Sequence, residues 1–156
     1  CGGSTGQESI WNGLNLLAEY YPMDSVVLIH DAVRPMVANE LIDNCIRGVN
    51  VYGNAVTAIG CYDALMETSD GVVSDSFISR ETVRRVQAPQ GFKLEQIVWA
   101  HKEARKRNIK NSLTSCTLMA TLGQKVFFVP GSEKNLKLTS PEDTEIFRAL
   151  IKERKA

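Results

Sequence analysis

The sequence predicts an α/β fold in which a mostly parallel sheet is flanked by helices. Short uninterrupted apolar runs alternate along the chain with segments of helical periodicity, and turn residues separate the two. Strands that are buried on both faces, as in a parallel sheet covered by helices, have such apolar runs. The length of 156 residues is typical of one domain, so we expect a single domain over residues 1–156.

The first half of the chain predicts helices and buried strands in alternation. Apolar residues recur at helical spacing over Ser9–Tyr20, and the apolar run Val26–Ile29 marks a strand over Ser25–His30. A second helix follows Asn39, which we expect to be its N-cap, because an Asn side chain accepts hydrogen bonds from the first helical turn. Ala55–Ile59 is the second buried strand.

A β-hairpin is predicted next. Asp63–Glu67 and Val72–Phe77 are short β-prone runs, and Ser69-Asp70-Gly71 between them contains Asp-Gly, a strong hairpin signal. The hairpin is more polar than the flanking strands, so we expect an arm over residues 61–81 that projects from the body. Such an arm either extends into solvent or packs on another subunit.

The second half of the chain resumes the alternation. Helices are expected over Leu94–Lys106 and Thr114–Leu122, and Lys125–Pro130 contains a third buried strand. Ser140, followed by Pro141 and two acidic residues, predicts the start of a last helix. Three strands with four or five helices make a small sheet, consistent with a missing N-terminal strand-loop-helix unit.

The composition excludes several classes of protein. Hydrophobic residues make up 44% and charged residues 23%, which excludes a disordered or fibrous chain. The 18 Lys and Arg balance the 18 Asp and Glu, so no net charge attracts the chain to nucleic acid or to an anionic membrane. No apolar stretch approaches the about 20 residues that span a bilayer.

The start of the chain and its cysteines carry further information. The chain begins Cys1-Gly2-Gly3 without an initiator Met or a signal-peptide pattern, so we expect that part of the protein is missing before Cys1. Cys45, Cys61 and Cys116 are widely spaced, with no Cys-x-x-Cys pair, which predicts buried free thiols in a cytoplasmic protein. Neither histidine fits a zinc-ligand spacing.

Charged residues follow the first predicted strand at its carboxyl end, where ligands bind in open α/β sheets. Asp31 comes directly after Ser25–His30, and its carboxylate suits a hydrated Mg²⁺ or a sugar hydroxyl. Arg34 carries a planar fork of donors that matches a phosphate. An ion-paired loop without a ligand is the alternative.

Two further groups of residues carry positive charge. Lys137 lies between two leucines, in a segment that we interpret as a short strand. It also precedes the start of the last helix, and a Lys beside a helix N-terminus indicates an anion site. Arg80, Arg84 and Arg85 form a local cluster that suits a phosphate-bearing small ligand. The alternatives are a solvated lysine and an exposed basic strand.

The glycines at the front of the chain give a weaker signal. Gly3 and Ser4 precede the helix that contains Ser9, and a glycine lets the backbone approach a ligand closely, whereas a frayed terminus is the alternative. No nucleophile with a histidine partner is visible. Cations around phosphates and one metal-compatible Asp predict phosphoryl or nucleotidyl transfer, which depends on alignment and charge stabilisation.

The same segments, in the same order, resemble the cytidylyltransferases that act on sugar-alcohol phosphates. The family includes 2-C-methyl-D-erythritol 4-phosphate cytidylyltransferase of isoprenoid synthesis and D-ribitol 5-phosphate cytidylyltransferase of teichoic-acid and capsule synthesis. The resemblance covers essentially the whole chain, and its motifs are Gly2-Gly3 with Ser9, Val27 to Pro35, Arg80, Gln87 to Phe92, Asn135 to Thr139, and Pro141-Glu142-Asp143.

The resemblance implies transfer of CMP from CTP to a polyol phosphate, which yields a CDP-polyol and diphosphate. It implies catalytic and nucleotide-binding roles for Asp31, which would also lie near Mg²⁺, and for Lys137, which would neutralise the α-phosphate. The remaining nucleotide-binding residues would be Gly3, Ser4 and Ser9. The residues that hold the polyol phosphate would be Arg34, Arg80, Ala64, Ala88 and Thr139.

The resemblance also implies a Rossmann-like nucleotidyltransferase sheet and a homodimer whose arm reaches into the partner's active site. The sequence departs from the family in lacking the glycine-rich nucleotide loop, with its catalytic Arg and Lys, and in carrying Gly6 at a common Arg position. Ala64 replaces a Thr that contacts the polyol, and Ser115 replaces a frequent acid. Because of these two replacements and the ribitol-type ending Phe147–Leu150, ribitol 5-phosphate is favoured over methylerythritol phosphate.

Two other functions stay open. A truncated fragment that only dimerises or binds a nucleotide would carry the same motifs. Another nucleotide-dependent α/β enzyme, such as a dehydrogenase, requires a Gly-x-Gly-x-x-Gly turn, which this stretch does not contain.

Overall fold

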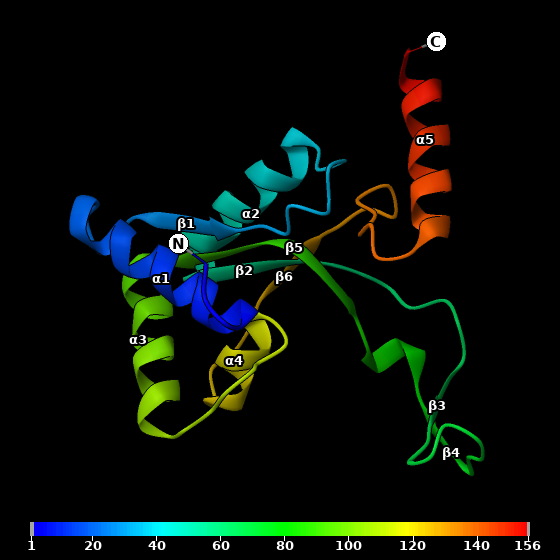
Figure 1. Cartoon of the computed structure of the whole chain (residues 1–156), viewed down its shortest axis with the longest axis horizontal. Helices are drawn as coiled ribbons and strands as arrows, with labels where there is room; N and C mark the ends of the chain where they lie inside the picture. Colours follow the sequence, from blue (N-terminus) through cyan, green and yellow to red (C-terminus); the bar gives the residue numbers. More distant parts are fainter. Residues whose placement is uncertain (1, 156) are drawn as a thin grey trace.

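Four strands form the main sheet, in the order β1-β5-β2-β6 (Figure 1). They are β1 (Val26–Ile29), β2 (Asn54–Ile59), β5 (Arg85–Lys93) and β6 (Phe128–Pro130). This computed structural model describes residues 2–155, and the side chains of residues 2–153. β1, β2 and β6 point in the same direction, and β5 runs antiparallel between β1 and β2. The predicted α/β fold is confirmed, with three strands in one direction and one strand opposed to them.

Helices cover both faces of this sheet (Figure 1). α2 (Asn39–Tyr52) lies on one face, and the other face carries α1 (Gly6–Tyr20), α3 (Leu94–Lys106) and α4 (Ser115–Thr121). A Cβ atom on Gly91 of β5 would lie 2.6 Å from Val49 Cγ2 and 2.8 Å from Cys45 Sγ. The absence of a side chain at this position therefore lets α2 pack closely on the sheet.

The helix starts differ from their predicted positions. α1 begins at Gly6 rather than at Ser9, because Thr5 is its N-cap and its hydroxyl accepts a hydrogen bond from Glu8 N at 3.1 Å. The prediction that Asn39 caps α2 was wrong. Asn39 is the first helical residue, and Ala38, which has no capping side chain, stands before it.

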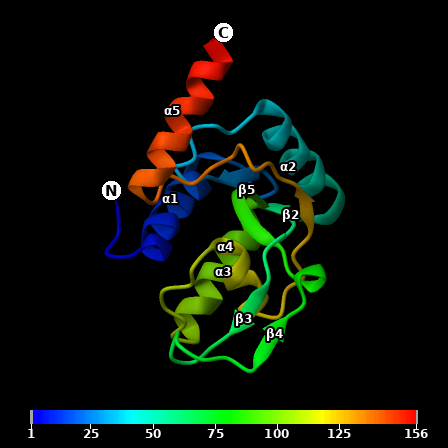
Figure 2. The ribbon, with the colours of Figure 1, turned by 90° about the vertical axis from the view of Figure 1, so that its right-hand side faces the viewer.

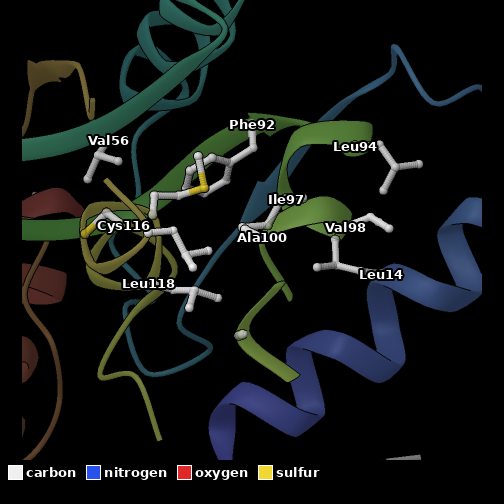
Figure 3. Packing of buried hydrophobic residues seen from close by; sticks show 12 residues of the cluster. Leu14, Val56, Phe92, Leu94, Ile97, Val98, Ala100, Cys116 and Leu118 are labelled. Carbon is white, nitrogen blue, oxygen red and sulfur yellow. The ribbon is translucent and has the colours of Figure 1, made fainter. Parts of the chain in front are cut away.

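The larger core lies between the sheet and the helices α1, α3 and α4. Figure 3 shows the Phe92 ring of β5 in this cluster, with Ile97 from α3, Leu118 from α4 and Leu14 from α1. Phe92 and Ile97 are completely buried. Burial of such side chains is the main stabilising term in a domain of this size.

A hairpin projects from this body. β3 (Leu65–Glu67) pairs with β4 (Ser76–Ile78), and a short 3-10 helix, η1 (Arg80–Thr82), leads back to β5. The predicted arm is confirmed, and Figure 1 shows it reaching away from the main sheet. The predicted strand start at Val72 was wrong, because the amides of Val72 and the next residue donate to Asp70 Oδ1 within a longer turn.

The last helix, α5 (Pro141–Lys155), stands apart from the sheet (Figures 1 and 2). Asp143 Oδ2 accepts hydrogen bonds from the amides of Thr139 and Ser140, both at 2.8 Å, which hold the pKa of that carboxyl below its usual range. The predicted start of this helix is confirmed. The predicted short strand around Lys137 was wrong, because residues 136–139 are irregular.

The described cysteines are free thiols. Cys45, Cys61 and Cys116 are buried thiols, as predicted, whereas Cys1 lies outside the described residues. Burial raises the pKa of the Cys45 thiol to about 11. Within residues 2–155, no helix has both the length and the apolar character needed to cross a membrane.

Candidate active site

Three charged side chains meet beyond the carboxyl end of β1. Asp31 and Arg34 lie in the loop after this strand, and Lys137 lies in the segment that joins β6 to α5. Asp31 Oδ2 is 3.2 Å from Arg34 Nε and 3.7 Å from Lys137 Nζ. The predicted placement of an acid and two cations at this edge of the sheet therefore matches the structure.

The three side chains differ in exposure. The Arg34 side chain is 10% exposed, whereas those of Asp31 and Lys137 are 41% and 47% exposed. Arg34 thus supports the Asp31 carboxylate from inside the protein, and Lys137 approaches it from the solvent side. Two cations around one carboxylate leave a net positive charge, which suits a phosphate that can accept the remaining N–H groups.

Backbone hydrogen bonds join the two loops that carry these residues. Leu138 N donates to Val33 O at 2.8 Å between the two loops, and within the first loop Arg34 N donates to Asp31 O at 2.9 Å. Arg34 Nη1 also donates to Asn135 O at 2.6 Å. These contacts fix the register between two segments that are distant in the sequence.

The predicted nucleotide residues at the front of the chain form a second group, at the start of α1. Gly3 N donates to Ser9 Oγ at 2.9 Å, and Ser4 N donates to Glu8 Oε2 at 2.7 Å. A second hydrogen bond, from Ser4 Oγ, strengthens this carboxylate contact and holds the pKa of Glu8 below its usual range. α1 runs antiparallel to β1 (Figure 1), and Ser4 and Glu8 line one hollow with Arg105 of α3.

A glycine is required in this front segment. A Cβ atom on Gly3 would lie 2.5 Å from Glu8 Cγ, which is too close for any side chain. Glu8 was not among the predicted site residues. Glu8 follows Thr5 by three residues, and this Thr-x-x-Glu spacing at a helix start is the sequence signal that indicates a capping acid.

The four remaining predicted residues do not contact the Asp31 cluster in the described contacts, and two of them belong to the arm that projects from the body. Arg80 Nη1 donates to Tyr62 O at 3.1 Å at the base of the arm, and Ala64 is exposed in the arm. Ala88 is buried in β5, and its carbonyl accepts a hydrogen bond from Asn135 Nδ2. Thr139 is exposed and its hydroxyl donates to Asp143 at 2.9 Å.

The residues present do not form a metal site of the protein's own. Within the part of the chain that the structure describes, no group of three or more His, Cys, Asp or Glu side chains could hold a metal ion. Asp31 is the carboxylate of the cluster, and its Oδ2 is already within 4 Å of two cations. One carboxylate paired in this way does not provide the several oxygen ligands that a resident Mg²⁺ requires.

Comparison with known proteins shows the family of the chain. The family model IspD, 2-C-methyl-D-erythritol 4-phosphate cytidylyltransferase, matches residues 1–153. The chain belongs to this family. The cluster of Asp31, Arg34 and Lys137 and the front loop with Gly3 both lie within the matched residues.

Relatives of the chain within this family carry two different names. The ribitol-5-phosphate cytidylyltransferase of Vibrio parahaemolyticus is 39% identical over 150 residues, which are 96% of this chain and 63% of that protein. The 2-C-methyl-D-erythritol 4-phosphate cytidylyltransferase of Clostridium acetobutylicum is 36% identical over 152 residues, 97% of this chain and 64% of that protein. The chain therefore spans less than two thirds of the length of these relatives.

A solved member of the IspD family has the same fold. The crystal structure of 2-C-methyl-D-erythritol 4-phosphate cytidylyltransferase from Thermus thermophilus is 31% identical and matches with a TM-score of 0.83. The match covers 97% of this chain and 71% of that chain. The antiparallel strand β5 and the projecting arm thus lie within a region that this family member shares.

Proposed function

We propose that this IspD-family protein transfers CMP from CTP to a polyol phosphate, with release of diphosphate. The observation that carries the proposal is the cluster in which Asp31 Oδ2 lies 3.2 Å from Arg34 Nε and 3.7 Å from Lys137 Nζ, in a chain that belongs to a cytidylyltransferase family. Cationic side chains bind phosphate groups through charge-assisted hydrogen bonds, and Lys137 is the exposed cation of the cluster.

In the proposed reaction, a phosphate oxygen of the polyol phosphate attacks the α-phosphorus of CTP. The new oxygen–phosphorus bond forms as the bond to the β-phosphate oxygen breaks, and diphosphate leaves with the electron pair. Negative charge grows on the oxygens of the α-phosphate in the transition state. Lys137 is exposed and close to Asp31, so its ammonium group is available to stabilise this charge.

The other site residues divide between the two substrates in this proposal. Gly3, Ser4 and Ser9 bind the cytidine, and Asp31 binds the ribose. Arg34 binds the phosphate of the polyol together with Arg80, which the arm of a second copy of the chain supplies, and Ala64 of that arm lines the same substrate with Ala88 and Thr139. Mg²⁺ enters as part of the substrate, bound to the triphosphate of CTP, because the described residues do not form a resident site.

The proposed acceptor is ribitol 5-phosphate. Support comes from relatives named ribitol-5-phosphate cytidylyltransferase that are 39%, 36% and 34% identical to this chain. Relatives named for methylerythritol phosphate reach 36% and 31%. The small difference favours ribitol 5-phosphate and makes methylerythritol phosphate the second candidate.

A substrate panel tests the reaction and the acceptor together. The complete protein is incubated with CTP and Mg²⁺ and, in turn, with ribitol 5-phosphate or methylerythritol phosphate, and diphosphate release is measured. We expect release with ribitol 5-phosphate to be the faster. Binding of CTP without diphosphate release from either acceptor would support the alternative, a fragment that only binds a nucleotide or dimerises.

We also infer that the protein acts in the cytoplasm as a homodimer held by the arm. The three buried thiols are compatible with a reducing compartment. In the arm, Phe77 and Met66 face each other in register and are 75% and 56% exposed, and Val72 at the turn is 89% exposed. Large apolar side chains gathered on one projecting element are typical of a protein interface.

Replacing Phe77 with serine is expected to weaken this dimer. Truncation of a central aromatic residue in an interface raises the free energy of association by about 2 kcal/mol, or about 30-fold in Kd. Sedimentation velocity over a concentration series measures the shift from dimer to monomer. Val51→Ser is the matched control, because Val51 is 71% exposed on α2, away from the arm. Equal dimer populations in the wild type and in Phe77→Ser would contradict the arm interface.

A further inference from the structure

The segment between β6 and α5 carries Lys137 but has no regular secondary structure over residues 131–139. No strand or helix therefore determines where its lysine lies. Its position must come from specific contacts with the rest of the protein. Leu138 N donates to Val33 O next to the lysine, and two buried carboxamide side chains hold the segment before it.

The first carboxamide holds the start of the segment. Gln87 of β5 donates from Nε2 to Ser132 O at 2.8 Å and accepts from Ser132 N at Oε1, at 3.1 Å. The preceding residue is Gly131, where a Cβ atom would lie 2.5 Å from Gln87 Oε1. The glycine therefore permits the close approach that both hydrogen bonds need.

The second carboxamide belongs to the segment itself. Asn135 is completely buried, and its Nδ2 donates to Ala88 O of β5 at 2.7 Å. Its backbone carbonyl accepts the 2.6 Å hydrogen bond from Arg34 Nη1. Asn135 Oδ1 is also buried, and it has no hydrogen-bond partner among the residues that the structure describes.

We propose that Asn135 is a positioning residue that fixes the guanidinium of Arg34 and, through it, Asp31 and Lys137. The Asn135 side chain anchors the segment to β5, and the anchored carbonyl holds Arg34 Nη1. Arg34 Nε then orients the Asp31 carboxylate, which meets Lys137 Nζ. The catalytic consequence rests on the proposed function, whereas the effect on the Arg34 guanidinium does not.

A measurement on Arg34 itself tests the proposal without any substrate. The Arg34 Nε–H group donates to Asp31 Oδ2 and belongs to a side chain that is 10% exposed, so its hydrogen exchange with solvent is slow and its signal is visible by ¹⁵N NMR. Asn135→Ala is expected to raise the exchange rate of this group at least 10-fold and to shift its resonance.

Asn54→Ala is the matched control for loss of stability. Asn54 is 2% exposed and also bridges backbone groups, because its Nδ2 donates to Lys125 O at 3.1 Å and its Oδ1 accepts from Phe127 N at 3.1 Å. It lies at the opposite end of β2 from the candidate site. We expect Asn54→Ala to lower the thermal stability without changing the Arg34 Nε–H signal at temperatures where both variants are folded.

The outcomes separate this proposal from the proposed function. Unchanged Arg34 Nε–H exchange in folded Asn135→Ala, or equal increases in both variants, would overturn it. If Asn135→Ala does not fold, Asn135→Leu fills a similar volume and still removes the donor to Ala88 O, and the same criteria apply. In the CTP assay, Asn135→Ala is expected to lower kcat/KM for the polyol phosphate about 10-fold, with Asn54→Ala unchanged. Absence of turnover in the wild type would contradict the proposed function, and the Arg34 signal would still decide the positioning role.

Discussion

Replacing Lys137 with alanine is expected to lower kcat for CMP transfer by about 10²–10³-fold, equivalent to about 2.7–4 kcal/mol of transition-state stabilisation. The ammonium group of Lys137 is 3.7 Å from Asp31 Oδ2, and its side chain is 47% exposed, so it is free to contact a bound α-phosphate. Charge on that phosphate grows in the transition state, and no other residue of the cluster is equally exposed and cationic. Steady-state measurement of diphosphate release gives kcat and KM separately.

The effect of this change should appear mainly in kcat, because the contact is stronger in the transition state than in the bound substrates. Lys134→Ala is the control, since Lys134 is exposed in the same segment and is not part of the charged cluster. It removes the same charge from the protein and is expected to change kcat less than about 3-fold. A normal kcat in Lys137→Ala would remove this residue from the proposed mechanism.

The sequence predicts the regular part of the fold well. β1, β2, the helices and the hairpin arm follow from apolar runs, helical periodicity and one Asp-Gly turn. β5 does not follow from such a pattern. Its residues, Arg85–Lys93, include Pro89 and two Gln, and they form neither an apolar run nor a sustained alternation of polar and apolar residues. Its position in the middle of the sheet depends on contacts with residues far away in the chain, and no local pattern encodes these contacts.

The candidate site divides in the same way. The place of Asp31 and Lys137 near the carboxyl ends of strands could be predicted, because strand ends are visible in the sequence. Gln87 and Asn135 belong to motifs that the sequence analysis names, but their support of the site could not be predicted, because the sequence does not show which contacts a polar side chain makes. Their burial depends on β5 and on an irregular segment, which are the parts of the fold that the pattern does not indicate.

Replacing Phe92 with alanine is expected to lower the free energy of unfolding by about 3–5 kcal/mol. Phe92 is completely buried on β5, pairs with Val27 of β1 and Asn54 of β2, and packs into the larger core (Figure 3). Domains are stable by about 5–15 kcal/mol, so this single change removes a large fraction of the total. Urea unfolding followed by circular dichroism measures the loss.

The contrast with Phe128 shows whether β5 is a central strand. Phe128 lies on β6, at one edge of the sheet, and is 53% exposed, so Phe128→Ala is expected to cost less than about 1.5 kcal/mol. Phe92→Leu keeps most of the buried volume and should lose less stability than Phe92→Ala, because the cavity that remains is smaller. Equal losses at Phe92 and Phe128 would mean that β5 is not held between β1 and β2. Gln87 and Ala88, which hydrogen-bond the Lys137 segment, would then not lie on a central strand. This stability comparison therefore also tests whether the strand that holds the proposed active site is rigid.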